Sequence, residues 1–348
     1  MNDLAKLKKL SGYDLSGFSL VGSDLSKANL KEARLSGANL SGSDLSGADL
    51  SQADLTGTNL SGADLYQAKL AGAKMNGADL SNTDCTSANF LDASLVGVNF
   101  NGAKLPQAVF SNAILNSADF SFADLSEANF KNAKLSGATF FKAVLHRAIF
   151  EDAKLFGARM QSSNLRNAIL RGADLSATHF RDSDLTESDL VKARLNSADF
   201  TNAIAKSTNF EEANLRSAVF SGAQVRLSNF EGANLASGRL SRSDFSGSSL
   251  EASDLWFARV SASKFEETNL KATNLLATGM NKKYTLSEFP SVTFSRSTKW
   301  DNQDVRRNTI SVAQNKSIEK EVMRHSFLSR LFKFSKWKGL ANGRIPPV

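Results

Sequence analysis

An apolar or small residue recurs at every fifth position from Leu10 to Met280, without an insertion or a deletion. A period of five matches neither the α-helix, with about 3.6 residues per turn, nor the β-strand, whose side chains alternate every two residues. A backbone that turns a corner once per pentapeptide would keep all these centres on one side. Four corners close a square coil of about 20 residues, and successive coils would stack at roughly 4.8 Å, the spacing of paired strands.

The other positions of each pentapeptide are also restricted. A small residue, most often Ala, stands two positions before the centre, and Asp or Asn is common between the two. The small residue is expected to point inward, because two large neighbours cannot share a corner of a close-packed interior. Ser and Gly, which suit tight turns, are frequent after the centre.

This pattern resembles the tandem A(D/N)LXX units of pentapeptide repeat proteins. Four segments carry the resemblance directly, the last with Phe as the centre: Ala48-Asp49-Leu50, Ala63-Asp64-Leu65, Ala213-Asn214-Leu215 and Ala128-Asn129-Phe130. The resemblance implies an all-β fold, a right-handed quadrilateral β-helix. It does not imply a single activity, because a repeat scaffold carries its function on its surface.

The sequence predicts four parts. Residues 1–9 form an N-terminal cap, residues 10–280 the β-helix, residues 281–316 a cap and linker, and residues 317–348 a basic amphipathic tail that is expected to be helical. The net charge of +7 arises in the last 68 residues, which contain 14 Lys or Arg and only 5 Asp or Glu. The repeat region is close to neutral by the same count.

Phenylalanine centres form two series with a spacing of 20 residues. One begins with Phe90 and Phe110, and the other, offset by ten residues, with Phe100 and Phe120. With four pentapeptides per coil, the two series are predicted to form columns on opposite sides of the interior. The columns shift by one side at Phe245, which predicts a change of packing near residues 235–245.

The chain contains none of the patterns that indicate an enzyme. It has no phosphate-binding glycine motif, no His or Cys cluster with metal-ligand spacing and no nucleophile with a neighbouring base. Its one cysteine, Cys85, occupies a centre and is predicted to replace a core leucine. We therefore expect no catalytic residue, no cofactor and no metal.

No apolar run is long enough to span a membrane, and the N-terminus lacks the apolar segment of a secretory signal. A cytoplasmic location is expected, and delivery into a host cell remains open.

Function is therefore expected on the outer surface of the second half of the coil. Counting in steps of 20 places His146, Arg166, Lys206 and Arg226 in one column, interrupted by Thr186. A neighbouring side carries Glu211, Glu231 and Glu251. The two columns either neutralise each other across the corner or form a partner-binding face. Exposed apolar residues in the same half, such as Phe141, Phe156, Ile149 and Ile169, are a further candidate contact patch.

The tail offers a second candidate surface. In a helix, Phe327, Leu331 and Phe334 would lie on the apolar side, with Arg330 at its boundary and Lys333 and Lys336 on the polar side. Such a helix can fold back on the coil, dock on a partner, or bind an anionic membrane surface or nucleic acid.

Two functions remain open at this stage. The first is a non-catalytic interaction scaffold that binds a protein partner or a membrane surface through these two regions. Long family members with tails of this kind resemble scaffolds or delivered effectors. The alternative, implied by the resemblance to other family members, is a DNA mimic that acts on DNA gyrase or topoisomerase IV. A mimic needs a dense acidic surface, so the near-neutral repeat region favours the scaffold. Direct binding of DNA is not expected.

Overall fold

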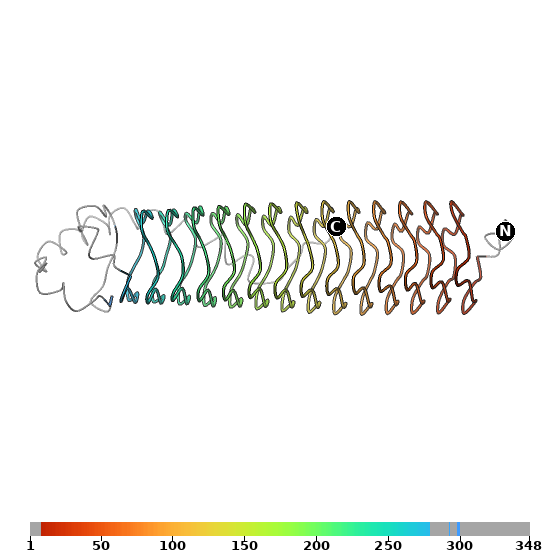
Figure 1. Cartoon of the computed structure of the whole chain (residues 1–348), viewed down its shortest axis with the longest axis horizontal. Helices are drawn as coiled ribbons and strands as arrows, with labels where there is room; N and C mark the ends of the chain where they lie inside the picture. The colour runs from red at the N-terminus through yellow and green to blue at the C-terminus, as the bar shows by residue number, and fades with distance from the viewer. Residues whose placement is uncertain (1–7, 279–291, 293–297, 300–348) are drawn as a thin grey trace, which may run out of the picture. The chain divides into compact units, whose positions relative to one another are not determined.

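The computed structural model describes residues 8–278, 292, 298 and 299. Residues 8–278 form one continuous coil whose turns follow one another along a single axis in chain order (Figure 1). The predicted first cap, the linker and the tail lie wholly or largely outside the described residues. The chain divides into two compact units, Met1–Trp300 and Asp301–Val348, and the second lies outside the described residues.

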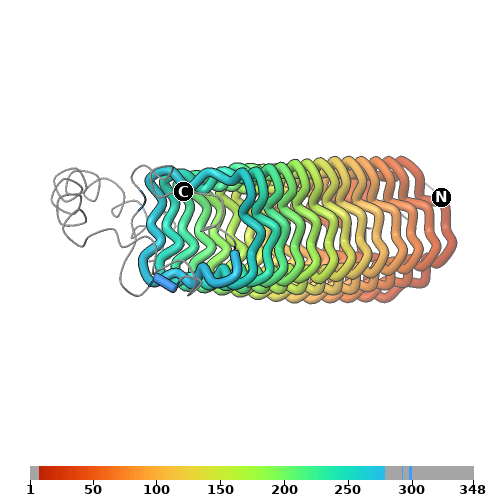
Figure 2. The backbone as a smooth tube through the Cα atoms, turned by 60° about the vertical axis from the view of Figure 1, so that its left-hand side comes forward, coloured from red at the N-terminus to blue at the C-terminus, as the bar shows by residue number. Residues whose placement is uncertain are grey.

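Parallel β-bridges join residues that lie 20 positions apart, from Lys9 with Asn29 to Asp254 with Asn274. Each coil therefore contains four pentapeptides, which confirms the four-sided β-helix. The described residues contain no helix and no strand longer than these single bridges. In the tube view the bends of successive coils line up along the stack (Figure 2).

Four of the five backbone N–H groups in a typical repeat donate to backbone carbonyls. In the repeat centred on Leu35, the Leu35 N–H donates to Asp54 in the next coil at 2.7 Å, and the Ala38 N–H closes the turn on the Leu35 carbonyl at 2.9 Å. The fifth N–H belongs to the residue after the centre. It donates to the side chain of the residue before the centre, as from Ser46 to the Oδ1 of Asp44 at 2.9 Å.

This fifth hydrogen bond explains the Asp or Asn of the motif. A polar backbone group without a partner destabilises a structure, and the short Asx side chain reaches the N–H two residues on. The same bond recurs at Asp64, Asp84, Asp124 and Asp184, among others. The residue before the centre is therefore part of the fold and not a neutral outward position.

The second residue after each centre has a positive φ throughout the coil, between +53° and +74° from Gly12 to Ala277. This conformation and the hydrogen bond that closes each turn are typical of a type II turn. Glycine adopts it without strain, but most of these positions carry a side chain. The left-handed conformation costs such a residue about 1 kcal/mol or more.

The predicted phenylalanine columns are confirmed. Phe90 stacks on Phe110 with ring centroids 4.7 Å apart and planes 5° apart. Across the interior, the edge of Phe100 meets Phe110 at 5.8 Å and 81°. The change of packing is also confirmed, because Phe245 is tilted by 56° against Phe230. The rings from Phe90 to Phe150 are fully buried and fill the interior.

A residue beyond the pentapeptide repeats pairs with the backbone of the last described coil. Lys299 pairs with Asn274, and the Lys299 N–H donates to the Thr273 carbonyl at 2.9 Å. Val292 packs against the core. That residues 281–316 begin with a cap on the last coil stays a prediction, because most of this segment lies outside the described residues.

Candidate interaction surface

The four basic residues predicted to share a column lie on one side of the coil. Each directly follows a centre of that side, and the backbone ladder joins successive coils there, as between the Arg147 N–H and the Arg166 carbonyl at 3.0 Å. Arg166, Lys206 and Arg226 are exposed and His146 is half-buried. The column is confirmed as an arrangement, while its role in binding remains a prediction.

The expected neutralisation of this column by the glutamate column is wrong. Arg166 instead pairs with Asp184 at 3.2 Å, and Arg226 with Asp244 at 3.9 Å. Each aspartate lies 18 residues later, on the same side of the next coil. The coil geometry explains this preference. The residue that follows a centre lies beside the residue that precedes the equivalent centre in the next coil.

The glutamates interact mainly with one another and with asparagines. The Glu251 carboxylate accepts a hydrogen bond from Asn269 at 2.9 Å, and Glu211 accepts one from Asn229 at 3.3 Å. Burial, followed by the charges of Glu251 and Glu211, raises the pKa of Glu231. This is the response expected of a carboxylate between two like charges.

A partly exposed apolar corner, in which Phe122 and Val144 are exposed and Phe141 is half-buried, borders the basic column. Phe122 and Phe141 come from successive coils and meet edge to face, with centroids 5.6 Å apart and planes 89° apart. The Lys142 ammonium lies 5.3 Å from the Phe141 ring centre and 5.9 Å from that of Phe122. Val144 follows on the side that carries His146. We call Phe122, Phe141, Lys142 and Val144 the aromatic corner.

The sequence pattern led to Phe141 as a candidate contact residue but not to Phe122. The signal was present, because Phe122 occupies the second position after a centre, where Gly, Ser and Asn prevail. Its φ is +62° and 55% of its surface is exposed. Of the other apolar candidates, Phe156 is 58% exposed, and Ile149 and Ile169 form a bridge between half-buried residues.

The predicted tail residues, from Phe327 to Lys336, lie outside the described residues. Within the described part of the chain, no group of three or more acidic, His or Cys side chains is arranged to hold a metal ion. No helix in that part has the length and apolar character needed to cross a membrane.

The square coil, its filled interior and its uninterrupted repeats define a solenoid protein whose outer surface is the part open to other molecules. Family models for pentapeptide repeats match residues 9–47, 33–70, 43–82 and 93–132, and a pentapeptide repeat region model matches residues 123–200 and 173–255. These matches cover more than half of the chain. The chain belongs to the pentapeptide repeat family.

Solved structures of family members are similar to this chain. HetL from Nostoc sp. strain PCC 7120, involved in heterocyst differentiation regulation, is 28% identical over 65% of this chain and 87% of its own, with a TM-score of 0.27. QnrB1, a plasmid-mediated fluoroquinolone resistance protein, is 22% identical over 58% of this chain and 88% of its own, with a TM-score of 0.29. A pentapeptide repeat protein of the Arabidopsis thaliana thylakoid lumen is 27% identical over 35% of this chain and 70% of its own, with a TM-score of 0.25. No curated protein matches the chain.

Proposed function

We propose that this protein is a non-catalytic interaction scaffold that binds a protein partner through the outer surface of the second half of its coil. The contact centres on the aromatic corner and extends to the adjoining basic column at His146 and Arg166. The single observation that carries this proposal is the exposed Phe122 at a backbone position that disfavours it.

Phe122 is costly where it lies. A bulky side chain with a positive φ is rare, and the left-handed conformation costs about 1–2 kcal/mol. The turn at residues 120–123 has the same closing hydrogen bond as the turns that carry Gly102 and Ser117 at this position. The fold therefore gains little from an aromatic residue there, and an exposed apolar side chain that the fold does not need is suited to contact with a partner.

The composition of the corner also suits a protein partner. Aromatic residues are enriched at the centres of protein interfaces, and a lysine over two rings adds a charged group that a partner carboxylate can reach. Exposed Phe156 lies on the preceding side of the coil and can widen the contact.

Site-specific photo-crosslinking in cells tests the proposal. Benzoylphenylalanine placed at position 122 of the full-length chain is expected to form one discrete adduct with a second protein. Ser162 provides the matched control, because it is exposed, has a φ of +57° and occupies the same turn position on the same side two coils later. No adduct from position 122, or the same adducts from both positions, would overturn the proposal.

The basic tail is proposed to support recruitment, either to the same partner or to an anionic membrane surface. Deletion of residues 317–348 is expected to leave the β-helix folded and to reduce co-sedimentation with phosphatidylserine vesicles or the crosslinking yield at position 122. If neither changes, the tail has no part in recruitment.

One observation favours the alternative, a DNA mimic acting on DNA gyrase or topoisomerase IV. Four aspartates form an unbroken ladder on one side of the first coils: Asp24, Asp44, Asp64 and Asp84. Each carboxylate also accepts the turn N–H two residues on, so the fold alone accounts for their presence. A supercoiling assay decides between the two functions. Inhibition or protection of gyrase that is lost in Asp44→Asn/Asp64→Asn would support the mimic, and no effect on gyrase would exclude it.

A further inference from the structure

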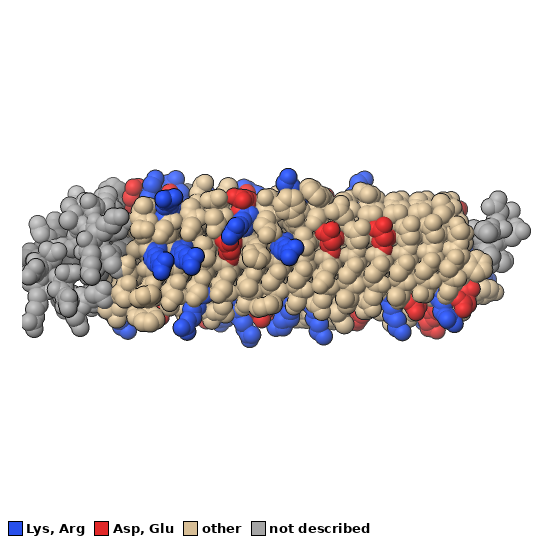
Figure 3. Space-filling view, in the orientation of Figure 1, with Lys and Arg blue, Asp and Glu red and all other residues tan. Residues whose placement is uncertain are grey.

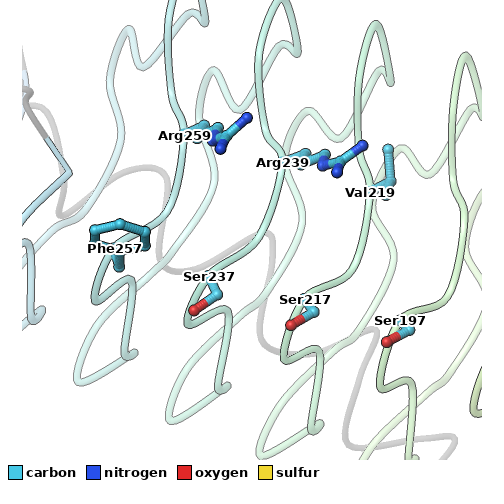
Figure 4. Close-up of a pocket in the computed structure, with 7 residues that line it drawn as sticks. All are labelled: Ser197, Ser217, Val219, Ser237, Arg239, Phe257 and Arg259. Atoms are coloured by element: carbon cyan, nitrogen blue, oxygen red, sulfur yellow. The ribbon is translucent and has the colours of Figure 1, made fainter.

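A shallow groove runs along the stack at one corner of the coil, between two rows of residues (Figure 4). One row is made by Phe257 and three serines in the same position of the preceding coils: Ser197, Ser217 and Ser237. The other row consists of Val219, Arg239 and Arg259. In the close-up the two arginine side chains point the same way, and Phe257 closes one end of the serine row.

Neither arginine has a counter-ion in the described part of the chain. They occupy the bridge position in successive coils, and among the described residues no carboxylate lies within ion-pair distance of either guanidinium. Two other arginines at the bridge position pair with an aspartate one coil earlier: Arg34 with Asp14 at 3.2 Å and Arg194 with Asp174 at 3.9 Å. The residue one coil before Arg239 is Val219, which cannot pair with it, and the residue one coil after it is Arg259, a second positive charge. Two like charges one coil apart repel each other unless solvent or a ligand offsets them.

The face in view in Figure 3 shows the same arrangement at a larger scale. Basic side chains gather in the half of the stack nearer its C-terminal coils, where the groove lies. The positive charge does not continue along the whole row. One coil before Arg239 the row carries Val219, and two coils before it carries Asp199, which pairs with Arg181 at 2.5 Å.

Phe257 is a second and independent sign of binding. It is 55% exposed with a φ of +60°, and its ring lies 5.8 Å from that of the exposed Trp256. The preceding coils place serine at this position, so the turn itself does not require an aromatic residue. Among the described residues with a positive φ, only Phe122 and Phe257 are aromatic.

The dimensions fit an extended peptide. Three steps of about 4.8 Å separate the first serine from Phe257, which gives a length of roughly 14 Å and room for about four residues at 3.3 Å each. The serine hydroxyls can donate to and accept from a peptide backbone. The arginines suit carboxylates, and Val219 and Phe257 suit apolar side chains.

We propose that this groove binds an extended segment of a protein partner that carries an aspartate or glutamate next to an apolar residue. This site is separate from the aromatic corner and does not depend on it. A single nucleic acid strand fits less well, because its phosphates require positive charge along the whole groove. Only Arg239 and Arg259 supply positive charge in this row, and the two preceding coils carry Val219 and Asp199.

Selection from a random peptide library displayed on phage tests this proposal with the full-length protein as bait. The selected peptides are expected to share a carboxylate beside an apolar residue. The affinity for the best peptide, measured by fluorescence anisotropy, is expected to fall at least tenfold in the double variant Arg239→Glu/Arg259→Glu. A peptide with asparagine in place of its aspartate should lose affinity to a similar extent.

Two further variants keep the test free of folding effects. Phe257→Ser restores the residue found in the preceding coils and is expected to weaken binding at least threefold with an unchanged melting temperature. Arg159→Glu is the matched control, since Arg159 is exposed in the same column outside the groove, and it should change the affinity less than twofold. Peptides without a common carboxylate, equal affinity in the double variant, or tighter binding of a twelve-residue oligothymidylate would each overturn the proposal.

Discussion

The Nε of Arg181 donates to the Oδ2 of Asp199 at 2.5 Å and joins two successive coils. The other carboxylate oxygen of Asp199 accepts the Thr201 N–H at 3.0 Å and the Thr201 hydroxyl at 2.6 Å. Burial alone would raise the pKa of Asp199, but the hydrogen bonds from Thr201 and Arg181 outweigh it and lower that pKa. The aspartate that caps a turn therefore also holds an ion pair between coils.

Arg181→Gln is expected to lower the free energy of unfolding at neutral pH, because the side chain of Asp199 is only 12% exposed and would lose its cationic partner. A carboxyl group with a lowered pKa in the folded state contributes stability above its unfolded pKa and loses it as the pH falls through the folded value. The difference between variant and wild type should thus shrink below about pH 4. Urea unfolding at several pH values measures it. Arg242→Gln, at an exposed arginine without an ion pair among the described residues, serves as the control, and an equal loss there would contradict the explanation.

Ala177→Gly is expected to stabilise the fold by about 0.5–1 kcal/mol. Ala177 has a φ of +56°, a conformation that glycine adopts without the steric cost of a Cβ atom. Ala173→Gly, four residues earlier at a fully buried inward position, should be destabilising. Melting temperatures of the two variants test whether the left-handed positions store strain. A lower melting temperature for Ala177→Gly would show that they do not.

Phe110→Ala is expected to cost about 3–5 kcal/mol, because the ring lies between Phe90 and Phe130, at 4.7 Å and 4.8 Å, and leaves a cavity when removed. Phe110→Leu should cost clearly less, since Leu is the centre in the same column at Leu70 and Leu170. Similar unfolding midpoints for the two variants would mean that the interior collapses around the cavity.

The Cys85 thiol is expected to be inert in the folded protein. Burial raises its pKa to about 12, so the thiolate that reacts with disulfide reagents is almost absent near neutral pH. Ellman's reagent should release no colour from the native protein and one equivalent per chain in concentrated guanidinium chloride. Rapid reaction of the native protein would place Cys85 outside the core.

The period of the repeat was enough to predict the interior. Once each coil has four corners, the positions of Phe90, Phe100 and Cys85 follow from counting, because every centre must point inward. The role of Asp44 and its equivalents did not follow from the pattern. It depends on which backbone N–H lacks a partner, and this becomes visible only when the ladder between coils is laid out.

The surface was harder to predict, because its interactions depend on side-chain reach and not on the period alone. Counting placed Arg166 and Arg226 correctly, but it paired them with the wrong carboxylates. The aromatic corner could have been found from the sequence, since Phe122 stands where the turn favours glycine. The arginine pair of the groove could not be found in this way. That Arg239 has no counter-ion among the residues that the structure describes depends on several neighbouring positions.

The free energy of unfolding of Phe122→Gly tests the central claim, that the exposed aromatic residues are kept for contact and not for folding. Glycine removes the ring contact with Phe141, worth about 0.5–1.5 kcal/mol, and relieves about 1–2 kcal/mol of backbone strain. We expect the variant to be as stable as the wild type, or more stable. A loss well above 1 kcal/mol would make Phe122 a structural residue and contradict the account.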